Sequence, residues 1–224
     1  VTVTPAGLNF QVEGHDFFLT LPGEHTAENV SAAIAIARCL GIDWNTLIAA
    51  AAKLKSPPGR IEFLPEAKAR GFELVVDYAF EPVAMARLYD VIKLKQPRRI
   101  IHVFGSTGGG RDVARRFTVG KFVGERADIC IVTDEDPYDD DPIAIMNDVA
   151  EAARGAGKKD GESLFIIPDR RAAIEKAITL AEPGDLVAIT GKGSEQAMVV
   201  KGKKIPWDDR AAARAALASL NKTL

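Results

Sequence analysis

Residues 99–133 decide the fold: they read RIIHVFGSTGGGRDVARRFTVGKFVGERADICIVT, with an apolar segment at each end. The segments 99–104 and 127–133 are nearly continuous runs of apolar residues, a pattern typical of strands buried on both faces of a sheet. A glycine-rich loop and a helical stretch at about 111–125 separate them. Strand, helix and second strand in this order predict one unit of a parallel sheet.

The same alternation continues on both sides of this unit. Further buried strands are predicted at 73–77, 163–167 and 186–190, and helices at about 82–95, 142–155, 169–181 and 208–220. Five strands separated by helices predict an α/β fold, a Rossmann-like and mostly parallel sheet with helices on both faces.

The first 60 residues follow a different pattern. Apolar and polar residues alternate between Gly and Pro turns over residues 1–21, which predicts short antiparallel strands. Helices are predicted at 26–40 and from the N-cap Asp43 to about Leu54. Ser56-Pro-Pro-Gly59 breaks the chain, so we place a domain boundary at 57–60. The region 1–60 is a thin α+β core, which we interpret as the tail of a larger domain because the chain opens at Val1 and not at Met.

Composition excludes several classes of protein. Lys and Arg number 29 against 31 Asp and Glu, so non-specific binding to nucleic acid has no electrostatic basis. No apolar run approaches the roughly 20 residues that span a bilayer, and no signal peptide opens the chain. Cys39 and Cys130 lie in apolar stretches, which favours buried thiols in a reducing compartment. We therefore predict a cytoplasmic protein that binds neither nucleic acid nor membrane.

Ligands of open α/β sheets bind beyond the carboxyl ends of the strands, so the loops there are the candidate sites. Four such loops carry polar residues: Asp77-Tyr-Ala-Phe80, the glycine-rich 105–112, the acidic run 134–141 and Gly191-Lys-Gly-Ser-Glu195. The first three also have a structural alternative. Asp77 can be a helix cap, the glycine-rich loop a flexible turn, and the acidic run a solvated helix start.

Common catalytic motifs do not fit this chain. Val113 stands where the dinucleotide fingerprint needs its third glycine, and Leu186 and Gly193 interrupt the P-loop pattern around Lys192. The three histidines give no catalytic triad, and we interpret His102, within an apolar strand, as a core residue. We predict no catalytic residue and no metal site.

In their order along the chain, these segments resemble the Mur ligase family, and within it the members that add a diamino acid to the peptidoglycan stem peptide with ATP. The matching segments span most of the chain: 21–33, 58–62, 76–79, 103–116, 133–142, 169–170, 184–185, 191–195 and 208–210. The resemblance implies that 1–60 is the end of the central ATPase domain and that 61–224 is the C-terminal Rossmann-like domain.

The resemblance also implies a function and its partners. Family members use ATP to phosphorylate an acceptor carboxylate, which an amine then attacks. ATP would be the cofactor, with Mg²⁺ bound mainly by the missing part, and the substrates would be an amino acid and a UDP-MurNAc-peptide. Because the P-loop is not in this chain, we expect it to be inactive alone.

Residue roles carry over position by position. The resemblance gives ATP contacts to Asn29 (the adenine), Arg60 and Asp77. It gives amino-acid contacts to Arg111 (the carboxylate), Glu135, Asp136, Tyr138, Gly191 and Glu195, the last two at the far end of the substrate.

This chain departs from the family pattern at several positions. Phe80 and Ser194 replace histidines, and the D-N-P-R motif reads Glu135-Asp-Pro-Tyr138, without the arginine that grips the second carboxylate of diaminopimelate. An acidic pocket without arginine suits a terminal ammonium, as on lysine or ornithine, by charge complementarity. This preference is a hypothesis.

Two other functions stay open on the sequence. One is a non-catalytic α/β binding module or partner subunit in cell-wall assembly. The other, less favoured because the glycine fingerprint is missing, is an unrelated nucleotide-binding Rossmann domain. In either case, strand edges exposed in 1–60 can drive homodimerisation.

Overall fold

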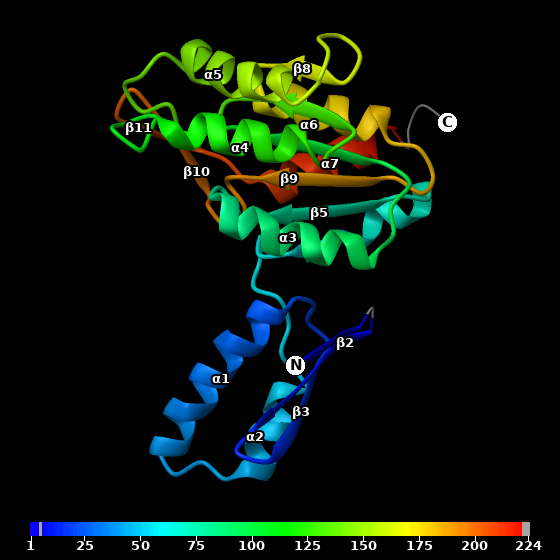
Figure 1. Cartoon of the computed structure of the whole chain (residues 1–224), viewed down its shortest axis with the longest axis vertical. Helices are drawn as coiled ribbons and strands as arrows, with labels where there is room; N and C mark the ends of the chain where they lie inside the picture. The colour runs from blue at the N-terminus through cyan, green and yellow to red at the C-terminus, as the bar shows by residue number, and fades with distance from the viewer. Residues whose placement is uncertain (5, 221–224) are drawn as a thin grey trace. The chain divides into compact units, whose positions relative to one another are not determined.

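The apolar segments of the second half form one six-stranded sheet in the computed structural model, which describes residues 1–4 and 6–220 (Figure 1). The strands lie in the order β4 (Glu62–Phe63), β5 (Glu73–Asp77), β9 (Leu186–Thr190), β6 (Ile100–Phe104), β7 (Ile129–Val132) and β8 (Leu164–Ile166). All pairs are parallel except β4 with β5. The predicted parallel sheet is confirmed, with β4 as an antiparallel edge too short for the sequence to indicate.

Helices follow the strands within a few residues of the predicted bounds. They are α3 (Pro82–Leu94), α4 (Ala114–Gly124), α5 (Pro142–Gly155), α6 (Arg170–Leu180) and α7 (Asp209–Leu220), with a 3₁₀ helix η1 at Pro65–Arg70. Figure 1 shows α4 and α5 on one side of the sheet and α6 and α7 on the other. The expected covering of both faces is confirmed.

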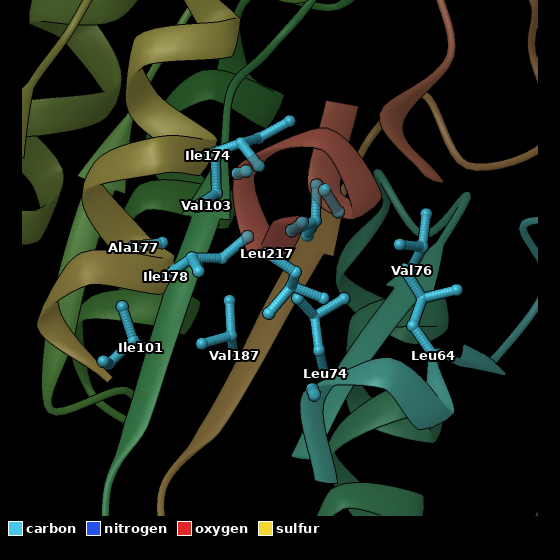
Figure 2. Close-up of a cluster of buried hydrophobic side chains, with 14 of the residues drawn as sticks. Leu64, Leu74, Val76, Ile101, Val103, Ile174, Ala177, Ile178, Val187 and Leu217 are labelled. Carbon is cyan, nitrogen blue, oxygen red and sulfur yellow. The ribbon is translucent and has the colours of Figure 1, made fainter. Parts of the chain in front are cut away.

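The core of this unit shows why the strands are nearly all apolar. Leu74, Val76, Ile101, Val103 and Val187 point to the face covered by α6 and α7, where they are completely buried (Figure 2). Their neighbours in sequence, such as Val75 and Ala188, are buried too. A strand covered on both faces cannot alternate apolar and polar residues.

A smaller unit comprises Val1–Ser56 with Ala86–Gln96, and the larger one Pro57–Met85 with Pro97–Leu224. The smaller unit contains an antiparallel sheet of β1 (Thr2–Thr4), β2 (Gly7–Val12) and β3 (His15–Leu19), together with α1 (Glu24–Cys39) and α2 (Trp44–Ala51). Asp43 is the N-cap of α2, accepting a hydrogen bond from the Thr46 N–H at 3.0 Å. The strands and the cap are as predicted, although α2 ends three residues before Leu54.

Two features were not predicted correctly. The hairpin of β10 (Ala197–Val200) and β11 (Lys203–Pro206) was missed, although its turn residues, Lys201 and Gly202, both have positive φ, as in a type I′ turn. The prediction that both thiols are buried is wrong for Cys39, which is exposed at the end of α1, and right for Cys130 in β7.

His102 is a core residue as predicted, with its Nε2 3.0 Å from the Thr190 hydroxyl. No helix within residues 1–4 and 6–220 is long and apolar enough to cross a membrane.

Candidate functional site

The four polar strand-end loops of the larger unit meet at one edge of the sheet. They follow β5, β9, β6 and β7, which are neighbours and parallel. Glycines allow the loops to pack on each other: a Cβ on Gly193 would lie 2.4 Å from the Tyr78 nitrogen, and one on Gly105 would lie 2.4 Å from the Thr133 carbonyl oxygen. The four loops therefore form one continuous candidate site.

Lys192 lies at the centre of this site. Its side chain is 1% exposed, and its Nζ lies 2.7 Å from Asp136 Oδ2 and 2.6 Å from Glu195 Oε2. Burial alone would lower the pKa of Lys192, but the hydrogen bonds to the two carboxylates outweigh burial and raise it. Lys192 is therefore a permanent positive charge that joins the loops after β7 and β9.

Glu135 is buried beside this cluster without a donor. It is 3% exposed, and no described residue donates a hydrogen bond to its carboxylate. Burial raises the pKa of Glu135 to about 7. Its Oε2 lies against Gly191, where a Cβ would come within 2.3 Å and displace the Glu135 carboxylate, and the φ of +103° favours glycine there.

Arg170 links the ends of β7 and β9 by hydrogen bonds to backbone carbonyls. Its guanidinium bonds to both oxygens of Asp209 at 2.8 Å, to the Thr190 carbonyl at 2.7 Å and to the Asp134 carbonyl at 3.2 Å. Arg170 and Asp209 are both buried. A buried Arg that satisfies several acceptors at once rigidifies the backbone that it contacts.

Asp77 and Arg60 lie together beside the loop after β9. The Asp77 carboxylate accepts hydrogen bonds from the Ile61 and Ala79 N–H groups, both at 2.7 Å. Burial raises the pKa of Asp77, and these two hydrogen bonds, which lower it, only partly offset the effect of burial. Arg60 is exposed and stacks on the Tyr78 ring at 4.3 Å, and the Tyr78 hydroxyl lies 3.2 Å from Glu195 Oε1. The hydrogen bond from the Ile61 N–H to Asp77 thus holds the backbone next to Arg60 in place.

The glycine-rich loop is less closely tied to the cluster. Arg111 is exposed ahead of α4, which begins three residues later than predicted, and no contact joins it to Lys192 or its partners in the described part of the chain. Ser106 is 5% exposed, and its hydroxyl has no partner among the described residues. Arg115, which the sequence analysis gave no role, is buried and bonds to Glu81 at 2.9 Å and to the Thr107 hydroxyl.

The acidic run divides into two parts. Asp134 is half-buried, and Glu135 and Asp136 are buried, so a solvated helix start is the wrong interpretation for these three. Asp139–Asp141 are exposed, and Asp141 caps α5 as that interpretation expects. Across residues 1–4 and 6–220, no three His, Cys, Asp or Glu side chains gather as metal ligands.

Tyr138, at the position where the resemblance expects an arginine, lies in a left-handed backbone conformation. Its φ is +53°, its N–H bonds to the Val199 carbonyl at 3.1 Å, and its carbonyl accepts from the Lys201 N–H at 2.7 Å. The ring lies against Gly109, where a Cβ would come within 2.7 Å. Tyr138 therefore links the glycine-rich loop to the β10–β11 hairpin. Asn29, by contrast, is exposed on α1 of the smaller unit.

Comparison with known proteins identifies the family. A family model described as "Mur ligase, glutamate ligase domain" matches residues 59–193, more than half of the chain. The chain belongs to the Mur ligase family. The resemblance inferred from the motifs is thereby confirmed, and an unrelated Rossmann domain is excluded.

The chain has curated relatives with two different names. It is 37% identical over 224 residues to a UDP-N-acetylmuramyl-tripeptide synthetase of Roseiflexus sp. (strain RS-1), an alignment that covers 98% of the chain and 43% of the relative. It is also 37% identical over 210 residues to a UDP-N-acetylmuramoyl-L-alanyl-D-glutamate–2,6-diaminopimelate ligase of Solibacter usitatus (strain Ellin6076), covering 94% and 41%. This Mur ligase chain thus spans less than half the length of these relatives.

Solved structures agree with the fold. A UDP-N-acetylmuramoyl-L-alanyl-D-glutamate–2,6-diaminopimelate ligase superposes with a TM-score of 0.66 at 28% identity, over 98% of this chain and 44% of that one. The UDP-N-acetylmuramate–alanine ligase of Thermotoga maritima gives a TM-score of 0.70 at 16% identity, over 100% and 45%, which supports the fold alone. The α/β fold of this chain is therefore that of its family.

Proposed function

We propose that this chain binds the incoming amino acid and one side of ATP in a ligase that forms an amide bond during peptidoglycan precursor synthesis. One observation carries the proposal: in a member of the Mur ligase family, four polar strand-end loops form a single site around Lys192. Two buried polar residues, Glu135 and Ser106, lie in two of these loops, and the Ser106 hydroxyl has no hydrogen-bond partner among the described residues. Such groups are typical of sites that complete their bonding with a ligand.

In the larger unit, Arg60 and Asp77 are the proposed contacts to ATP. In the smaller unit, Asn29 is the proposed contact to the adenine. An exposed guanidinium held over a tyrosine ring suits phosphate oxygens. Asp77 holds the backbone next to Arg60, and each of its oxygens has a second lone pair left for a ligand hydroxyl. ATP supplies a phosphoryl group when bound, and Mg²⁺ would be held mainly by residues outside this chain.

The amino-acid side of the proposed site comprises Arg111 for the carboxylate, with Glu135, Asp136, Tyr138, Gly191 and Glu195 around the rest of the substrate. Glu195 is half-buried and keeps part of its carboxylate accessible. Glu135 changes its protonation near neutral pH, so it can gain or release a proton when an amine binds. The UDP-MurNAc-peptide is the proposed second substrate of the whole enzyme.

Domain organisation follows from the same proposal. Residues 1–60 would end the central ATPase domain, and 61–224 would be the C-terminal domain, which the family match at 59–193 supports. Since the P-loop pattern does not occur in the 224 residues, we expect no ligase turnover by this chain alone. The cytoplasmic location and homodimerisation also remain proposals, and light scattering that shows a clean monomer would contradict the second.

Binding measurements on the 224-residue chain test the proposed function. Titration with lysine, ornithine, diaminopimelate and a non-hydrolysable ATP analogue, followed by amide NMR shifts, should show amino-acid binding in the four loops. Arg111→Ala should weaken amino-acid binding, whereas Arg126→Ala, a second exposed arginine at the far end of α4, should not change it. Absence of binding for every amino acid would overturn the proposal, and turnover by this chain alone would contradict its dependence on a missing P-loop. Binding that persists without turnover after an ATPase part is supplied would favour a non-catalytic module.

A further inference from the structure

The glycine-rich loop 105–112 carries Arg111 on a stretch of backbone that its own sequence does not fix. Residues 108–110 are three successive glycines, which leave the chain free to adopt many conformations just before Arg111. On one side, the Gly108 N–H donates to the Asp136 carbonyl at 2.8 Å, which ties this loop to the loop after β7. The position of Arg111 therefore depends on such anchors to neighbouring loops.

Arg115 anchors the other side of the glycine-rich loop. Its guanidinium donates to the Thr107 hydroxyl and, at 2.9 Å, to Glu81 in the loop after β5. It also lies over the Phe80 ring, with 5.1 Å between Cζ and the ring centroid, and Phe80 packs edge-on against Tyr78 at 5.1 Å. One side chain thus joins the glycine-rich loop to the loop after β5, next to the tyrosine on the nucleotide side of the proposed site.

Arg115 is far more buried than its ionic partner. The Arg115 side chain is 6% exposed, whereas the Glu81 side chain is 49% exposed. Removing a charge from water costs free energy, and a partner that stays in contact with solvent offsets only part of that cost. The pair with Glu81 therefore gives the fold little net stability, and the main structural consequence of burying Arg115 is its bond to Thr107.

We propose that Arg115 is a positioning residue, which holds the glycine-rich loop through Thr107 and so places Arg111 for the carboxylate of the incoming amino acid. The inference rests on the proposed function. Arg115 acts through the loop and not through contact with the ligand. Because the α-carboxylate is common to all amino acids, this role does not depend on the substrate side chain, and lysine and diaminopimelate should be affected alike.

Arg115→Met tests the proposal because it keeps a long apolar side chain and removes the donors. The dissociation constants of lysine and diaminopimelate would be measured by calorimetric titration of the 224-residue chain. We expect both constants to rise about tenfold, the effect of one lost hydrogen bond to a charged group. The urea midpoint should change little, because the half-exposed Glu81 remains solvated. Arg99→Gln is the control, since it breaks an arginine–carboxylate pair at the opposite edge of the sheet and should leave both constants unchanged.

Thr107 supplies a second test that leaves the arginine in place. Thr107→Val removes the hydroxyl and should weaken binding about as much as Arg115→Met does, whereas Thr107→Ser keeps the hydroxyl and should stay within about threefold of wild type. If the two residues act through one bond, the double variant should bind no more weakly than the weaker-binding single variant. Losses that multiply would show that Thr107 contacts the ligand independently of Arg115, which contradicts the proposal.

A purely structural role for Arg115 would give a different result. Arg115→Met would then lower the urea midpoint and leave both dissociation constants unchanged, which would overturn the inference while amino-acid binding stood. A loss confined to one of the two amino acids would also overturn it, and Thr107→Val remains a sufficient test if Arg115→Met fails to fold. If the wild-type chain bound neither amino acid, the proposed function would fail and the inference would fail with it.

Discussion

Buried carboxylates differ in hydrogen bonding between the two ends of the parallel strands, called here the amino edge and the carboxyl edge of the sheet. At the amino edge, Asp185 has a side chain that is 0% exposed, and it accepts hydrogen bonds from Arg98 at 3.1 Å, Arg99 at 2.6 Å and the Glu182 N–H at 2.9 Å. Burial would raise the pKa of Asp185, but these donors outweigh burial and lower it. At the carboxyl edge, Glu135 is nearly as buried and accepts no hydrogen bond from the part of the chain that the structure describes, and burial raises its pKa to about 7.

This difference separates a structural acid from a candidate functional one. A buried carboxylate with a purely structural role stabilises the folded protein when its oxygens accept hydrogen bonds, as those of Asp185 do. A buried acid left without donors destabilises the fold, which makes it a candidate for completion by a ligand or a proton. The carboxyl edge is therefore the place to test for function, and the amino edge supplies matched controls.

The largest expected effect comes from removing the central cation of the carboxyl edge. Lys192→Met leaves Asp136 buried and without its ionic partner, so we expect the free energy of unfolding to fall by about 3 to 4 kcal/mol at pH 7. Urea denaturation measures this. Lys159→Met, which breaks an exposed pair with Glu162 at 3.6 Å, should cost less than about 0.5 kcal/mol. Equal losses in the two variants would show that Lys192 is not a buried ionic centre.

Glu135 offers the next test, through pH. Since the pKa of Glu135 is raised from 4.5 to about 7 in the folded state, its protonated form stabilises the protein fully below about pH 4.5. That contribution is lost as the pH rises through 7. Glu135→Gln keeps a neutral side chain, so the variant should gain about 2 to 3 kcal/mol relative to wild type between pH 4.5 and pH 8. Urea denaturation at several pH values measures the gain.

His102 provides the internal reference for that experiment. Burial lowers the pKa of His102 to about 3, so its contribution to stability is present above pH 6.5 and decreases as the pH falls towards 3. This trend is common to both proteins and cancels in their difference. A difference that did not depend on pH would mean that Glu135 is ionised in the fold like an exposed acid.

The sequence predicted the sheet better than the pairing of charges within it. Continuous apolar runs reveal buried parallel strands because burial on both faces leaves few polar positions: in 100–104 and 186–190 the polar side chains are His102 and Thr190, which bond to each other. Ion pairs carry no such local signal. Lys192 reaches an aspartate 56 positions away, and Arg98 one 87 positions away, so only the fold brings them together. For the same reason the sequence revealed the acidic run but not that its first half is buried.

A smaller effect is expected from weakening the amino edge. Arg99→Gln removes the shortest arginine bond to Asp185, at 2.6 Å, and two further bonds at 3.2 Å, so the pKa of Asp185 should rise towards its ordinary value. Arg99 is about one-third exposed and Arg98 remains, so we expect a loss of only about 1 kcal/mol at pH 7. Because the lowered pKa of Asp185 stabilises the fold above about pH 4, the loss should vanish in acid. Carboxyl NMR titration would follow Asp185 directly, and an unchanged pKa would contradict the role given to Arg99.

The smallest expected effect is a difference in alkylation between the two thiols, Cys39 and Cys130. Cys130 lies in β7, the strand that leads to Glu135, and burial raises the pKa of its thiol to about 12. Burial that no donor offsets thus suppresses ionisation in both groups. Cys39 is exposed, so iodoacetamide should modify Cys39 and leave Cys130 intact in the native chain, since the thiolate is the reactive form. Mass spectrometry of the alkylated peptides measures this, with denatured protein as the control in which both thiols react. Modification of Cys130 under native conditions would show that the strands at the carboxyl edge open to solvent more readily than their burial implies.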